Sequence, residues 1–306
     1  MQEKSSRIAV IDIGTNTCIL LIAELVNGKT VTVFETFDTP RLGEGLEVSG
    51  EISKEATARV SKTLRNFETL SRKYNCDRIF AFGTYTLRNA RNSKQVISDL
   101  NQKFDSGIEI ISAEMEARCS YYGATFDFPF SHDYAVIDIG GGSTEFGYLF
   151  DDLFYYKSLN IGAVTLKDKF FSDGKFGREK VKQAVDLLND EFMKINFLNL
   201  YNKDLIGVAG TPVTYYALIN NMKNFKEDKI HGKTLETFQI SSMINILSKK
   251  DTTQIRTMGD FMKGRADIIV PGGLILNEFM KYFGFNEIKI STKGLRYGVF
   301  FYLLKN

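Results

Sequence analysis

The stretch Ala9-Val10-Ile11-Asp12-Ile13-Gly14 returns unchanged as Ala135-Val136-Ile137-Asp138-Ile139-Gly140. In both copies a run of β-branched and small apolar residues ends in an aspartate followed by a glycine. This pattern is typical of a buried strand that runs into a loop. A repeated strand and loop predict an internally duplicated protein in which each half contributes one part of a shared site.

Each copy continues into a loop of small polar residues. The first loop reads Thr15-Asn16-Thr17 and the second reads Gly141-Gly142-Ser143-Thr144. Glycine lets main-chain N–H groups approach an anion closely, and a carboxylate at a strand end suits a hydrated Mg²⁺. We therefore expect two phosphate-binding loops, with Asp12 and Asp138 as candidate metal ligands. At either position, an aspartate that only accepts backbone N–H bonds is the alternative interpretation.

The segments that follow the loops repeat as well. Strands are expected at 19–26 and 30–37 around the turn Asn27-Gly28, and at 145–150 and 153–158 around Asp151-Asp152. Strands and helices alternate afterwards, and the spacing of apolar residues predicts a helix over 53–74. The pattern favours an α/β fold with two similar halves and a cleft between them.

Length and punctuation indicate two domains. A chain of 306 residues is long enough for two hydrophobic cores, and Pro129 lies in a segment, 126–131, that interrupts the regular pattern just before the second copy. We predict a first domain over 1–125 and a second over 126–294. The helix expected at about 295–306 is predicted to pack back on the first domain.

Composition excludes several classes of protein. No segment approaches the ~20 apolar residues that span a bilayer, and residues 1–6 lack the apolar run of a secretory signal. The 3 cysteines are widely spaced, and the net charge is +2. The C-terminal part is locally basic, which either helps to attract a polyanion or is only a solvated surface, and nothing in it resembles a nucleic-acid-binding patch. We expect a cytoplasmic protein whose partners include neither nucleic acid nor membrane, while a homodimer stays open.

The order and spacing of these segments resemble the exopolyphosphatase and guanosine pentaphosphate phosphohydrolase (Ppx/GppA) family in its short two-domain form. The segments that carry the resemblance are 12–17, 41–46, 84–92, 114–118, 138–145, 158–166, 207–212, 265–267 and 294–296. The resemblance implies two actin-like domains of the ribonuclease H-like type, which belong to the superfold of actin, hexokinase and Hsp70 (ASKHA). It also implies Mg²⁺-dependent release of terminal orthophosphate from inorganic polyphosphate, with guanosine pentaphosphate as a second substrate.

The resemblance assigns roles to individual residues. Glu116 falls on the family's catalytic glutamate, which orients and deprotonates water, and Glu145 is expected to help position the water or the metal. The implied metal ligands are Asp138, Asp12 and Glu145. The expected phosphate-binding residues are Gly14, Thr15, Asn16, Thr17, Arg88, Gly140, Gly141, Gly142, Ser143, Thr144, Gly210 and Thr211.

Two other functions stay open. An ATP-dependent phosphotransferase of the same superfold would carry the same loops, although Glu116 favours water over an acceptor hydroxyl as the nucleophile. A weakly catalytic polyphosphate or nucleotide sensor is the other alternative. It is raised by Ile19, where the family often has a basic residue, and by Met115, where it has a glutamate.

Overall fold

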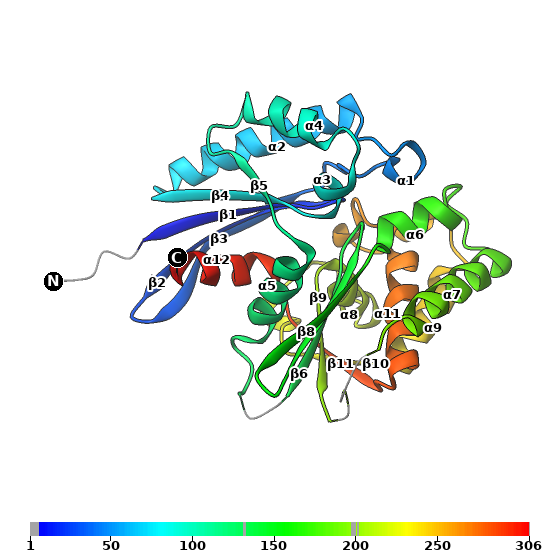
Figure 1. The fold of residues 1–306 in the computed structure, drawn as a ribbon. Coiled ribbons are helices and arrows are strands. Elements are labelled where there is room, and N and C mark those ends of the chain that lie inside the picture. The colour runs from blue at the N-terminus through cyan, green and yellow to red at the C-terminus, as the bar shows by residue number, and fades with distance from the viewer. Residues whose placement is uncertain (1–5, 131–132, 197–199, 201, 306) are drawn as a thin grey trace.

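The computed structural model describes residues 6–130, 133–196, 200 and 202–305. Its strands form two mixed sheets, one in each half of the chain (Figure 1). The strands are β1 Arg7–Ile13, β2 Cys18–Val26, β3 Lys29–Asp38, β4 Arg78–Gly83, β5 Ile108–Ile110, β6 Tyr134–Ile139, β7 Thr144–Phe150, β8 Leu153–Leu159, β9 Asp204–Val208, β10 Thr234–Glu236 and β11 Glu287–Ile290.

Helices cover the faces of both sheets. The α-helices are α1 Leu46–Ser49, α2 Lys54–Lys73, α3 Tyr85–Asn89, α4 Ser93–Asn101, α5 Ala113–Thr125, α6 Ala163–Phe170, α7 Arg178–Met193, α8 Gly210–Ile219, α9 Thr237–Leu247, α10 Thr252–Arg256, α11 Ile269–Phe283 and α12 Leu295–Lys305. Two short 3₁₀ turns, η1 Glu227–Lys229 and η2 Asp260–Met262, complete the second half.

The two sheets share one topology. The first has the order β3-β2-β1-β4-β5, and the second has the order β8-β7-β6-β9-β11 with β10 added at its edge. In each, the first three strands are antiparallel, and the next strand along the chain lies parallel to the first. The predicted duplication and the α/β fold are therefore confirmed.

Both hairpins predicted from the sequence are present. Asn27 and Gly28 adopt φ values of 50° and 74°, and Asp151 and Asp152 adopt 49° and 60°. Two consecutive left-handed residues match the right-handed twist of the flanking strands. These local signals fix the register of β2 on β3 and of β7 on β8.

The central strands of the first sheet are covered on both faces. One face packs against α2, and its cluster includes Ile11 and Leu20 with Val60 and Leu64 of the helix. The other face presents Val10, which lies in a separate cluster with residues of α12. Since side chains alternate along a strand, Asp12 projects to the same face as Val10, toward α12.

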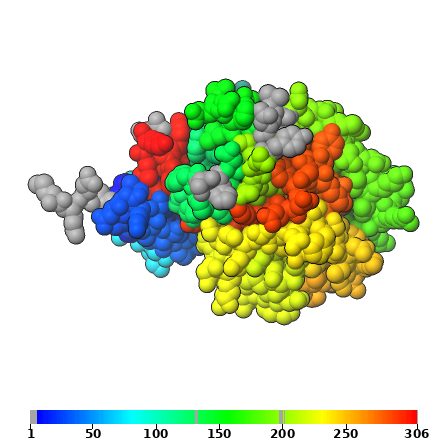
Figure 2. Space-filling model, turned by 90° about the horizontal axis from the view of Figure 1, so that it is seen from below, coloured from blue at the N-terminus to red at the C-terminus, as the bar shows by residue number. Residues whose placement is uncertain are grey.

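The last helix of each half packs across the other half. Helix α5 contacts β6, β7, β8 and β9 of the second sheet, whereas α12 contacts β1 and β2 of the first (Figure 1). Figure 2 shows the same crossing from below, where the C-terminal helix in red lies beside the N-terminal strands in blue. The domain division at residues 125 and 126 stays a prediction, because α5 itself packs on both sides of it.

Helices α5 and α12 approach each other closely at two glycines. A Cβ atom on Gly298 would lie 1.9 Å from the carbonyl oxygen of Cys119, and one on Gly123 would lie 2.0 Å from that of Gly294. Only glycine fits at such a backbone contact. The crossing fixes α5 between the two sheets.

Within the described residues, no helix is both long and apolar enough to cross a membrane.

Candidate active site

Each copy of the repeated strand places an aspartate at the interface of the two halves. Asp12 lies near the end of β1 and Asp138 near the end of β6. By the alternation of side chains, Asp138 shares a face with Val136, which packs against α5 residues. Asp12 faces α12 and Asp138 faces α5, so the two carboxylates point toward the crossed helix pair.

Helix α5 brings Glu116 to these aspartates. The helix begins after Ser112, whose hydroxyl accepts the N–H of Met115 and caps the first turn. One helical turn beyond Glu116, the Ser120 hydroxyl donates to Oδ2 of Asp138 at 2.5 Å. The Glu116 side chain is buried, and Arg88 of α3 donates to its Oε2 at 2.9 Å. One helix thus holds Asp138 and supplies the glutamate.

Glu145 lies directly opposite Asp138 in the antiparallel pair of β6 and β7. The Ser158 hydroxyl donates to its Oε1 at 2.7 Å, and the Ser143 hydroxyl forms a second hydrogen bond to its carboxylate. In the first half, the residue opposite Asp12 is Ile19. The duplicated strands therefore carry one extra carboxylate in the second half.

Burial raises the pKa of all four carboxyl groups, and repulsion by a neighbouring carboxylate adds to it for Asp12, Glu116 and Glu145. For Glu116, burial and repulsion by Asp138 raise the pKa to about 7, with burial as the larger cause, although the nearby Arg88 guanidinium lowers it. Burial and repulsion by Glu116 and Asp138 raise the pKa of Asp12 to about 8. Burial also raises the pKa of Asp138, and burial and its neighbours raise that of Glu145 well above its usual range. The site carries more potential negative charge than its surroundings neutralise.

A divalent cation fits this excess of charge. The Oδ1 atom of Asp12 is buried and has no hydrogen-bond partner among the residues that the structure describes. Oxygen ligands of this kind suit Mg²⁺, which usually keeps several of its waters and takes only one or two carboxylates. In the described ranges, no group of three or more Asp, Glu, His or Cys side chains lies close enough together to hold a metal ion.

The two predicted phosphate loops have the same backbone turn. The N–H of Gly14 donates to the carbonyl of Thr17 at 3.1 Å, and the N–H of Gly140 donates to that of Ser143 at 3.0 Å. These two N–H groups are therefore used inside the loops. The Thr144 hydroxyl is also engaged, since it donates to the carbonyl of Ile161.

The loops touch each other across the cleft. A Cβ atom on Gly141 would lie 2.9 Å from Cβ of Thr15, and one on Gly142 would lie 2.1 Å from Cδ1 of Tyr85 in the first half. Both glycines are needed for this close approach. Atoms of the two loops and of Tyr85 therefore fill the space between them, and we call this arrangement the closed form.

The structure places Arg88 against the catalytic candidate, Glu116. Its Nη1 atom donates both to Glu116 and, at 3.0 Å, to the carbonyl of Ile111. In the closed form this guanidinium fixes the orientation of the Glu116 carboxylate. The contact of Arg88 with phosphate stays a prediction.

Gly210 and Thr211 lie in the first turn of α8, next to Arg265, to which the sequence alone gave no role. Ala209 precedes them with φ 66° and ψ −164°, a strained conformation for any residue except glycine. The Arg265 guanidinium fills the position that a Cβ atom on Gly210 would take, since such a Cβ would lie 1.3 Å from Nη1 of Arg265. The segment 265–267 is part of the family resemblance, but its contact with α8 depends on the fold. The helix N-terminus and this guanidinium together favour an anion.

The fold and the site define a two-lobed α/β protein with a pair of matching loops and buried acidic groups at the interface of its halves. The chain belongs to the Ppx/GppA phosphatase family, whose model matches residues 21–306.

Comparisons with individual proteins agree. The chain is 31% identical to a bifunctional 3-dehydroquinate synthase/phosphatase of Fusobacterium nucleatum, over 92% of this chain but only 44% of that protein. It is 29% identical to a putative exopolyphosphatase of Haemophilus influenzae, over 98% of this chain and 92% of that protein. The solved structure of the Aquifex aeolicus PPX-GPPA enzyme matches with 26% identity and a TM-score of 0.80, over 97% and 99% of the two chains.

Proposed function

We propose that this protein is a Mg²⁺-dependent phosphoanhydride hydrolase that releases terminal orthophosphate from inorganic polyphosphate. Guanosine pentaphosphate, hydrolysed to the tetraphosphate, is a second substrate. The observation that carries the proposal is the position of Glu116, buried on α5 and electrostatically coupled to both strand-end aspartates. Membership of a phosphatase family and the relative named as a putative exopolyphosphatase support it.

Glu116 is the proposed general base. A base works best when its pKa lies near the operating pH, and the pKa of Glu116 is raised to about 7. Arg88 holds Oε2, so that Oε1 is the atom available to orient a water and take its proton. The raised pKa and the fixed carboxylate make water, rather than an acceptor hydroxyl, the proposed nucleophile.

The acidic residues of the strands would hold the cation. Asp12, Asp138 and Glu145 are the proposed ligands, directly or through water, and bound Mg²⁺ would neutralise charge on the phosphoryl group. Ser120, Ser143 and Ser158 fix the orientation of Asp138 and Glu145 by hydrogen bonds. The protein's contribution is therefore a set of oxygen atoms held in place before the substrate arrives.

Phosphate binding requires the two halves to separate first. In the closed form Gly141 and Gly142 lie against Thr15 and Tyr85, which leaves no room for a phosphoryl group between the loops. We propose that the halves open to admit the chain end of the substrate and close again to bring Glu116 to it. The N-terminus of α8 with Arg265 supplies a further anion contact for the rest of the substrate.

The test is phosphate release from polyphosphate and from guanosine pentaphosphate, each with Mg²⁺ and with a chelator. We expect release with Mg²⁺ that the chelator abolishes. A parallel assay supplies ATP and a small acceptor; ADP formation that depends on the acceptor, without free phosphate, would replace the proposal by a phosphotransferase. Tight binding of both substrates without turnover would make the protein a sensor.

A further inference from the structure

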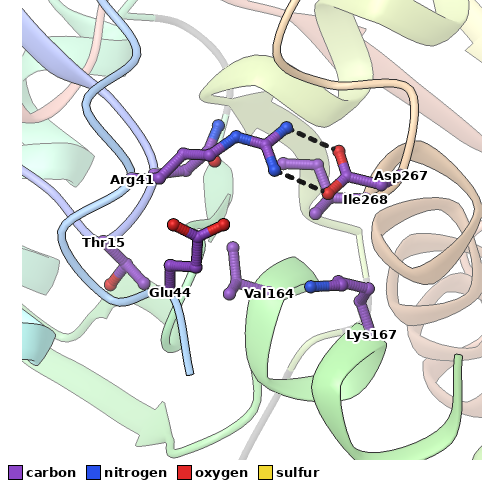
Figure 3. A pocket seen from close by; sticks show the side chains of 8 residues that line it. Thr15, Arg41, Glu44, Val164, Lys167, Asp267 and Ile268 are labelled. Atoms are coloured by element: carbon purple, nitrogen blue, oxygen red, sulfur yellow. Dashed lines mark hydrogen bonds and ion pairs between the residues drawn. The ribbon is translucent and has the colours of Figure 1, made fainter. Parts of the chain in front are cut away.

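A small pocket joins the two halves next to the first phosphate loop (Figure 3). Its lining residues from the first half are Thr15, Asn16, Arg41 and Glu44, and those from the second half are Val164, Lys167, Asp267 and Ile268. Across it, the guanidinium of Arg41 donates two parallel hydrogen bonds to the carboxylate of Asp267, each 2.9 Å long. This ion pair connects the two halves and is partly exposed to solvent.

The backbone of the first half directs Arg41 into this pocket. Arg41 has a φ of 53°, which residues other than glycine rarely adopt. Its N–H donates to the carbonyl of Asn16 at 3.0 Å, and the N–H of Gly43 donates to that of Thr15 at 2.9 Å. Arg59 supports the turn from outside by donating to the carbonyls of Pro40 and Arg41. The turn is therefore built onto the phosphate loop itself.

The second half meets the turn at Gly264. Its carbonyl accepts from Nδ2 of Asn16 at 3.3 Å and from Nη2 of Arg41 at 3.4 Å. A Cβ atom on Gly264 would lie 2.8 Å from Cγ2 of Thr39, so the two segments are in direct contact. These contacts hold Asp267 against Arg41 in the closed form.

We propose that Arg41 is a phosphate-binding residue of the substrate site, and that Asp267 occupies its guanidinium while the two halves are closed. A guanidinium pairs with a carboxylate and with a phosphoryl group through the same fork of two N–H donors. The Asp267 carboxylate thus stands where a phosphoryl oxygen pair of a polyanion would bind. The inference rests on the proposed function, since it names a further contact of that site.

The exchange couples binding to opening. A polyphosphate chain that takes the Arg41 guanidinium must displace Asp267, and loss of this ion pair removes a contact that holds the halves together. The free energy needed to open the closed form then subtracts from the binding free energy, which lowers the apparent affinity for the polyanion. Lys167 lines the other wall of the pocket, where its ammonium pairs with Asp168 at 2.7 Å, so Arg41 is the guanidinium or ammonium group on which the proposal rests.

A double-mutant cycle tests the proposal without turnover. Binding of tripolyphosphate is measured by calorimetry in the presence of a chelator, for wild type, Asp267→Asn, Arg41→Gln and the double variant. Asp267→Asn should tighten binding about fivefold, the scale of a partly exposed ion pair, and Arg41→Gln should weaken it by a similar factor. In the Arg41→Gln background, Asp267→Asn should have no effect.

Glu44→Gln is the matched control. It removes an equal charge from the same pocket, but Glu44 pairs with Arg59 and makes no ion pair with Arg41. Equal tightening by Glu44→Gln and Asp267→Asn, or an unchanged Asp267→Asn effect without Arg41, would mean simple charge repulsion and would overturn the inference. A protein that binds tripolyphosphate with the predicted coupling but hydrolyses nothing would contradict the proposed function alone.

Discussion

Replacement of Asp12 by asparagine should make the metal-free protein less sensitive to alkaline pH. The pKa of Asp12 is raised to about 8 from a usual value of 3.8, so between these values the native state holds a proton that the unfolded state has lost. The free energy of unfolding then falls as pH rises through this window, by up to ~1.4 kcal/mol per pH unit for one group. From about pH 5.5 to about pH 7.5, Asp12 alone contributes a loss of roughly 2 to 3 kcal/mol.

The assay is urea unfolding at these two pH values with a chelator present. The free energy of unfolding of the wild type should fall toward the higher pH. For Asp12→Asn the fall should be smaller by roughly 2 to 3 kcal/mol. Asparagine keeps the shape of the side chain and carries no charge, so the substitution removes the cost of ionisation in a buried site. Saturating Mg²⁺ should restore wild-type stability at the higher pH, because a cation favours the ionised form.

Glu114→Gln is the control for this experiment. Glu114 lies on the same helix as Glu116 but is exposed and pairs with Arg118, so its removal should leave the pH dependence unchanged. A wild-type stability that does not change between the two pH values, or an Asp12→Asn variant with the same loss as wild type, would refute the electrostatic account of the site.

Three further predictions test the architecture. Gly298→Ala should lower the free energy of unfolding by about 2 kcal/mol or more, because its Cβ would lie 1.9 Å from a backbone oxygen of α5; thermal unfolding measures this. Gly142→Ala should prevent closure against Tyr85 and enlarge the radius of gyration in small-angle scattering, whereas an unchanged profile would speak against the closed form. Asp138→Asn should raise the Mg²⁺ concentration for half-maximal phosphate release by roughly tenfold or more, and an unaltered metal titration would exclude it as a ligand.

The fold was predictable where local signals are strong. The repeated strands and the two hairpin turns follow from short runs of residues, and all are confirmed. The helix predicted over 53–74 is observed as α2, capped by the Ser53 hydroxyl, which accepts the N–H of Ala56. These features need only the periodicity and capping chemistry of neighbouring residues.

Other elements were missed for physical reasons. Helix α8 begins at Gly210, three residues before the apolar run that starts at Val213, because Pro212 in the first turn lacks an N–H that would in any case have no partner there. Helices α6 and α9 were not predicted. Helix α6 forms where its first N–H groups, those of Ala163 and Val164, meet the carbonyls of Gly140 and Gly141, which is a long-range contact.

The site was predictable as a set of residues and not as a set of contacts. The strand-end aspartates followed from the repeat, but the crossing of α5 that brings Glu116 to them depends on Gly123 and Gly298, far apart in the chain. The Arg88 and Glu116 pair and the position of Arg265 over Gly210 likewise arise only when distant segments pack. The catalytic and ligand roles of these residues stay predictions.

The most direct test of the central claim is the effect of Glu116→Gln on polyphosphate hydrolysis. Turnover and substrate affinity are measured separately, with Glu114→Gln as the control from the same helix. We predict that Glu116→Gln lowers kcat by roughly a hundredfold or more, the scale of a positioned general base, while binding is retained and the control keeps wild-type turnover. A Glu116→Gln variant that turns over at the wild-type rate would contradict the account.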